Sequence, residues 1–129
     1  MTEIHNVQLG FTGLQSLKDL LEDVSMGNQE TPPPYHLGWN RYYDYNSDFV
    51  PLFNRVLDST RDDLGFTTKE TQLIIGEATD LIFYLNRQIL EYPQAYEDHT
   101  KQILKLQRLI FIVASQTIDI YAMEEQSNG

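Results

Sequence analysis

The chain has no cysteine among its 129 residues, so disulfides, thiolate metal sites and cysteine nucleophiles are excluded. It also lacks a hydrophobic run near the roughly 18 residues that span a bilayer. The longest apolar run, residues 109–114, is short and is preceded by three basic residues. No basic stretch followed by an apolar one, the pattern of a secretory signal, opens the chain. We therefore expect a cytoplasmic protein that does not enter a membrane.

Basic residues are scarce. Nine Lys and Arg stand against nineteen Asp and Glu, which gives a formal net charge of −10. Nucleic-acid binding depends on clustered basic side chains that displace counterions, so we do not expect it here. The charge favours a protein partner with a basic surface, because opposite charge accelerates encounter. The alternative, which explains the acidity equally well, is that the negative charge only keeps the protein soluble.

Signatures of catalysis are also missing. The chain has no G-x-S-x-G, G-x-x-x-x-G-K-[ST] or G-x-G-x-x-G, and its glycines are scattered singly. His5, His36 and His99 lie in separate segments, and none has a second metal-ligand type three or four residues away on a helix. We expect these histidines on the surface, and we expect no cofactor and no enzymatic activity.

Helical periodicity appears in the first half of the chain at two places. Apolar residues at spacings of three and four predict a helix over residues 14–25, with Thr12 as its N-cap and Gly27 as its stop. A second helix is predicted to begin at Ser47, whose hydroxyl caps a first turn that contains Pro51. Residues 62–65 read as a turn after it. The buried stripe of the second helix is predicted to be Phe49, Leu52, Phe53, Val56 and Leu57.

The second half predicts two longer helices. Thr67 and Glu70 form a capping box that opens a helix over residues 68–91, and Pro93 ends it. The last helix is predicted over residues 94–124. It carries one apolar stripe at alternating spacings of three and four, and a second at spacings of seven. The first stripe contains Ile103, Leu106, Ile110, Val113, Thr117 and Ile120, and the second contains Leu104, Phe111 and Ile118.

These patterns predict one all-α domain that resembles a four-helix bundle, with a long aromatic, proline-rich crossover between helices 1 and 2. The short connection at Pro93 predicts a long helical hairpin at the C-terminus. Residues 1–10 and 125–129 are expected to be flexible ends. Residues 3–11 are the only candidate strand, which has nothing to pair with unless another chain supplies a second one.

The crossover is the first candidate binding site. Three consecutive prolines at residues 32–34 force an extended backbone, and the residues that follow are rich in Tyr and Trp, which are common at interface hot spots. The alternative is that these rings only cover the core of the bundle. The predicted partner-binding residues are Tyr35, Trp39, Arg41, Tyr42, Tyr43, Asp44, Tyr45 and Asp48.

The wide apolar surface of the last helix is the second candidate. A helix that is apolar over more than half of its surface contacts neighbours on two sides, so it is either the central helix of the bundle or part of an oligomer interface. For the second case, a possible homodimer, the predicted interface residues are Leu104, Phe111, Ile112 and Ile118.

A row of carboxylates on the third helix is the third candidate. Glu77 and Asp80 lie three residues apart and Glu70 lies seven before Glu77, so oxygen ligands for a divalent cation would share one flank. Residues 76–87, GEATDLIFYLNR, resemble the E-x-x-D helix of the all-α nucleoside-triphosphate pyrophosphohydrolases. That family also has an E-E-x-x-E helix upstream, which this chain lacks. The alternative is a solvated flank of a core helix.

The sequence thus favours a non-catalytic, acidic protein-binding module that docks on a partner and inhibits, neutralises or scaffolds it, as immunity proteins, antitoxins and phage inhibitors do. The alternatives are a homo-oligomeric structural or regulatory subunit built on the last helix, and a metal-dependent enzyme that uses Glu70, Glu77 and Asp80.

Overall fold

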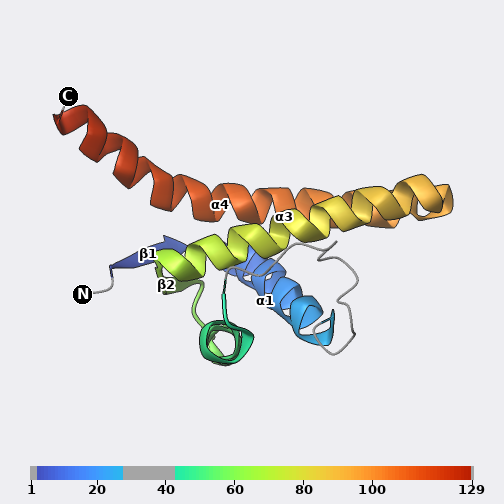
Figure 1. Ribbon diagram of the computed structural model, residues 1–129, viewed down its shortest axis with the longest axis horizontal. Helices are drawn as coiled ribbons and strands as arrows, with labels where there is room; N and C mark the ends of the chain where they lie inside the picture. Colours follow the sequence, from blue (N-terminus) through green and yellow to red (C-terminus); the bar gives the residue numbers. More distant parts are fainter. Residues whose placement is uncertain (1–2, 28–42, 129) are drawn as a thin grey trace.

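A computed structural model describes residues 3–27 and 43–128, with side chains as far as residue 117. In this part of the chain there are four α-helices and a two-stranded sheet, which confirms the all-α prediction (Figure 1). The α-helices are α1 (Gly10–Gly27), α2 (Val50–Asp58), α3 (Thr68–Glu91) and α4 (Tyr96–Asn128). The strands are β1 (Ile4–Gln8) and β2 (Asp63–Thr67), and shorter helices span Tyr45–Phe49 and Pro93–Ala95.

Helices α3 and α4 form the predicted antiparallel hairpin and lie side by side along most of their length (Figure 1). Tyr92 leaves the helical region at φ −132° and ψ 80°, as expected for a residue that precedes proline. One turn of 3-10 helix, Pro93–Ala95, then reverses the chain. On α4 the first predicted stripe is confirmed where it is described, since Ile103, Leu106, Val113 and Thr117 are buried and Ile110 is half-buried. The second predicted stripe is not part of the core, because Leu104 and Phe111 are exposed. The other buried residues of the pair include Ile74, Ala78, Leu81, Leu85 and Leu109.

Helix α1 packs against the hairpin with its predicted stripe of leucines, of which Leu17 and Leu21 are fully buried (Figure 1). Its start differs from the prediction, because the helix begins at Gly10 rather than after Thr12. Gly10 has a φ of +71°, which glycine adopts without strain. Thr12 is therefore an exposed residue of the first turn and not the N-cap.

The second predicted helix also starts differently. Asp44, not Ser47, is the cap, since its carboxylate accepts a hydrogen bond from the amide of Ser47 at 3.0 Å. A π-helical turn, Tyr45–Phe49, follows, and α2 begins only at Val50, with Pro51 in its first turn. Phe49, Leu52 and Val56 of the predicted stripe are buried and Phe53 is half-buried, but Leu57 is 43% exposed.

The small sheet corrects two predictions. β1 pairs antiparallel with β2, in the register Ile4↔Thr67 to Gln8↔Asp63. The candidate strand therefore has a partner within the chain, and most of the expected turn at residues 62–65 is strand. Residues 4–8, expected in a flexible end, carry side chains into the core: Val7 is buried and pairs with Leu64, and His5 is buried and pairs with buried Phe66. The second strand was missed because Asp62, Asp63 and Gly65 are residues typical of a turn.

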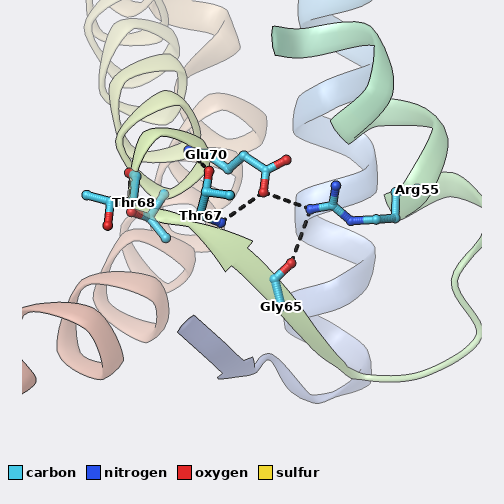
Figure 2. A network of polar contacts seen from close by, with 6 residues as sticks. Arg55, Gly65, Thr67, Thr68 and Glu70 are labelled. Carbon is cyan, nitrogen blue, oxygen red and sulfur yellow. Dashed lines mark hydrogen bonds and ion pairs between the residues drawn. The ribbon is translucent and has the colours of Figure 1, made fainter. Parts of the chain in front are cut away.

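Side chains cover the outer edge of β2. Arg55 of α2 donates to the carbonyl oxygen of Gly65 at 3.1 Å and forms an ion pair with Glu70 at 2.9 Å (Figure 2). Glu70 also accepts from the amide of Thr67 at 2.9 Å, while Thr67 Oγ1 accepts from the amide of Glu70 at 3.0 Å. This reciprocal pair is the predicted capping box. Backbone groups of β2 that do not pair with β1 are therefore hydrogen-bonded by the side chains of Arg55 and Glu70.

The edge of β1 is engaged in a different way. The side-chain amide of Gln116 on α4 accepts from the amide of Gln8 at 2.7 Å and donates to its carbonyl oxygen at 2.8 Å. The N-terminal strand is thereby joined to the last helix, 108 residues away in the sequence.

We expect Thr67→Ala to lower the free energy of unfolding by about 0.5–2 kcal/mol, because the first turn of α3 loses its cap. The same substitution at Thr12 is the control and should be neutral or slightly stabilising, since Thr12 caps no helix and alanine is the better helix former. Chemical denaturation of both variants measures the difference, and an equal loss at the two positions would contradict the assignment of the cap.

Candidate functional site

Only the end of the aromatic crossover lies within the described residues. Tyr35, Trp39, Arg41 and Tyr42 fall outside them, so their contact with a partner stays a prediction. His36 also falls outside them, and its expected place on the surface stays a prediction. Tyr43, Asp44, Tyr45 and Asp48 are described, and the structure shows what each of them contacts.

Tyr43 covers a buried carboxylate. Its side chain packs against the core, and its hydroxyl donates a hydrogen bond to Glu77 Oε1 on α3. Glu77 is only 2% exposed. The expectation that Glu77 lies on a solvated flank is therefore wrong, because the chain that leads into α2 closes over this side of α3. A buried carboxylate is costly unless it is hydrogen-bonded, so the tyrosine hydroxyl matters for stability.

Tyr45 is attached to the core as well. Its ring stacks on Phe49 with centroids 4.8 Å apart, and its hydroxyl lies 3.4 Å from the Ser25 hydroxyl of α1. Tyr43 and Tyr45, the two described tyrosines of the crossover, thus pack inward. For these two residues the structure supports the covering role rather than the partner-binding role.

The two described aspartates have local structural roles. Asp44 caps the π-helical turn, and Asp48 forms an ion pair with Lys69 at 3.0 Å. Asp48 also accepts from the amide of Asp44 at 2.8 Å, and this bond, together with Lys69, holds the pKa of the Asp48 carboxyl below its ordinary value. Their charges are nevertheless near the surface, where they contribute to the acidic field of the protein.

The three candidate metal ligands are not brought together. Glu70 is held by the capping box and Arg55, and Glu77 is buried under Tyr43. Asp80 is half-buried, and this burial raises its pKa above the ordinary value. Within residues 3–27 and 43–128 no three His, Asp or Glu side chains are grouped as a metal site.

The described histidines differ from the surface placement that we expected. His5 is buried in the sheet, with its Nε2 3.0 Å from the Thr68 hydroxyl at the start of α3. His99 on α4 is half-buried. His5 therefore has a structural role that the sequence did not indicate, because the contact joins residues 63 positions apart.

A shallow groove of about 340 Å³ lies between α1, α3 and α4. Leucines form its floor, and its walls carry aspartates of α1 opposite lysines of α4. Burial raises the pKa of Asp23 above its ordinary value, and the neighbouring carboxylates of Asp19 and Glu22 add to this effect. Sequence reasoning missed the groove because its two walls are far apart in the chain. The charged lining residues are Asp19, Asp23, Asp98, Lys101 and Lys105.

Several large apolar side chains of the described residues are exposed on the side of the α3–α4 hairpin that faces away from the core. Phe83 is 62% exposed and Leu90 83% on α3, while Leu104 is 59% exposed and Phe111 71% on α4. Leu104 and Phe111 were predicted, whereas Phe83 and Leu90 were missed, although their spacing of seven was a signal. Ile112, also predicted here, is instead half-buried and lies close to Gly13 of α1. The side chain of Ile118 lies outside the description.

This surface follows one pattern on both helices. Residues recur at spacings of four, three and four, so each set lies along one side of its helix. All eight residues are uncharged, and seven are exposed, with Thr100 half-buried. We call this set the hairpin face: Thr79, Phe83, Asn86 and Leu90 of α3 with Thr100, Leu104, Gln107 and Phe111 of α4.

Comparison with protein-family models, with curated proteins and with solved structures finds no match for this chain. None of the described helices is both long and apolar enough to cross a membrane. The hairpin face and the acidic charge of the chain are thus the features on which a functional assignment rests.

We expect Tyr43→Phe to lower the free energy of unfolding by about 1–3 kcal/mol, because the buried Glu77 carboxylate loses a hydrogen-bond donor. Tyr45→Phe, two residues away, is the matched control and should cost less, since its hydroxyl contact of 3.4 Å is at the limit of a hydrogen bond. Urea denaturation of the two variants measures this; a larger loss for Tyr45→Phe would contradict it.

We expect Asp23→Asn to stabilise the protein at neutral pH. Burial in the folded state raises the pKa of Asp23 above its ordinary value of 3.8, so the ionised carboxylate costs stability as the pH rises through the raised pKa. The gain should disappear as the pH falls to 3.8 and below, where the carboxyl is protonated in both states. Exposed Glu3→Gln controls for the loss of one negative charge, and an equal gain there would contradict the prediction. Thermal unfolding over this pH range is the measurement.

Proposed function

We propose that this protein is a non-catalytic protein-binding module, and that the hairpin face is its main contact surface. The observation that carries the proposal is the exposure of Phe83, Leu90, Leu104 and Phe111 on one side of the α3–α4 hairpin. Large exposed apolar patches on folded proteins mark sites of interaction. Aromatic residues with few charges among them are also typical of the centre of an interface.

The use of the described carboxylates supports binding over catalysis. A general acid or a metal ligand needs access to a substrate. Glu70 is bound to Arg55 and the amide of Thr67, and Glu77 lies under Tyr43. These two groups therefore stabilise the fold.

The charge of the chain supports a partner with a basic surface at a second point of contact. Residues 81–117 contain four basic and three acidic residues, so the strong negative charge belongs to the rest of the chain. Such a field accelerates encounter with a basic protein. In this proposal the protein inhibits, neutralises or scaffolds that partner, and Tyr35, Trp39, Arg41 and Tyr42 add contacts beside Asp44 and Asp48. The absence of cysteine fits a cytoplasmic location.

A homo-oligomeric subunit is the second candidate function. It uses the same surface, and the lack of charge on the hairpin face favours it.

A photo-crosslinking amino acid placed at Phe111 tests the proposal in cells. We expect adducts heavier than the monomer by the mass of a protein, because the side chain at this position lies within the contact surface. Phe11 of α1 is the matched control, since it is also an exposed phenylalanine, 74% against 71%, but lies outside the hairpin face. Adducts from Phe11 alone, or none from Phe111, would contradict the proposal.

A further inference from the structure

We infer that the occupant of the hairpin face is a second copy of this chain, so that two hairpins pair into a symmetric four-helix dimer. This inference rests on the proposed function, because it takes the hairpin face as the contact surface and assigns its partner.

The position of the exposed residues favours a second layer of helices. Phe83 is nine residues from buried Ile74, which places it half a turn away on the opposite side of α3. Phe111, five residues after buried Leu106, likewise points away from the core side of α4. Helices α1 and α2 lie on one side of the hairpin (Figure 1). The large apolar side chains of the hairpin face, Phe83, Leu90, Leu104 and Phe111, are exposed on the other side.

The spacing of the face matches packing between helices. Positions 79, 83, 86 and 90 on α3, and 100, 104, 107 and 111 on α4, alternate steps of four and three. This is the spacing at which residues of one helix fit between those of a facing helix in coiled coils and four-helix bundles. Two such rows on antiparallel helices present a surface that fits the same surface of another copy, as a two-fold interface requires.

The exposed area is sufficient for a stable dimer. At 150–250 Å² for an aromatic side chain and the smaller area of leucine, the four apolar residues expose on the order of 300–500 Å². A standard interface buries about 800 Å² per partner, of which roughly 60% is apolar. The apolar area on the hairpin face is thus close to what one side of such an interface contains.

The charge distribution selects a copy of the chain over a basic partner at this surface. None of the eight residues of the hairpin face is charged, although 22% of the chain is. Two molecules of charge −10 can meet here without burying an unpaired charge. The nearby exposed residues Arg87, Glu97 and Arg108 carry both signs, so the margins need not repel.

Sedimentation equilibrium of the purified protein tests the inference. We expect twice the chain mass of 15.0 kDa at concentrations on the order of 100 μM. Phe83→Asp and Phe111→Asp should each raise the dissociation constant at least about 30-fold, the loss typical of an interface hot spot. Phe11→Asp introduces the same change at an exposed site outside the face and should leave the dimer intact. Circular dichroism should show unchanged helix content in all three.

Added salt gives an independent result. Because both copies are strongly acidic, screening should tighten the dimer as the salt concentration rises. A contact that depends on attraction between opposite charges would weaken instead. A dimer that weakens with salt, or one that neither substitution on the face affects, would place the interface elsewhere and overturn the inference.

The outcomes separate this inference from the proposed function. A purified protein that stays monomeric overturns the dimer. If crosslinking at Phe111 in cells then yields an adduct with a different protein, the hairpin face is still a binding surface and the proposed function stands. If the protein is monomeric and Phe111 yields no adduct, both fail.

Discussion

Apolar side chains between α3 and α4 hold together two helices of 24 and 33 residues, and the rest of the fold is arranged around that contact. Helix α1 adds its leucine stripe to the same core, and β2 leads directly into α3. Each of the two long helices would be less stable alone in water than in the hairpin, because helices in proteins gain most of their stability from packing. The hairpin therefore determines where all other surfaces lie, including the hairpin face.

The carboxylate of Glu70 connects α3, α2 and β2. It accepts from the amide of Thr67, which sets the start of α3, and it binds Arg55 of α2. Arg55 also binds the carbonyl oxygen of Gly65 at the edge of β2. A local capping interaction thus also orients a helix and covers a strand. The spacing of Glu70 to Glu77 suggested a metal ligand, but its carboxylate is already bound by Arg55 and by the amide of Thr67. To bind a metal ion it would have to give up these contacts.

The sequence predicted what short-range chemistry determines. The capping box at Thr67 and Glu70, the stop before Pro93 and the first apolar stripe of α4 depend on neighbours within a few residues, and the described residues confirm all three. The pairing of β1 with β2 was missed because it joins five-residue segments about 60 residues apart. The burial of Glu77 depends on Tyr43, 34 residues away, and no spacing within α3 signals it. Half of the apolar hairpin face was found on α4, while Phe83 and Leu90 were missed because α3 already had one clear apolar side.

The contact between Gln116 and Gln8 has a consequence for how the protein avoids unwanted association. A primary amide offers the same donor and acceptor as a peptide group, so Gln116 occupies the place that one residue of a third strand would take. An extended segment of another molecule cannot pair with Gln8 unless it displaces this side chain first. The last helix therefore blocks strand pairing at this edge of β1. Without the helix, the amide and carbonyl groups of Gln8 would be available to pair with a strand of another molecule, which promotes aggregation.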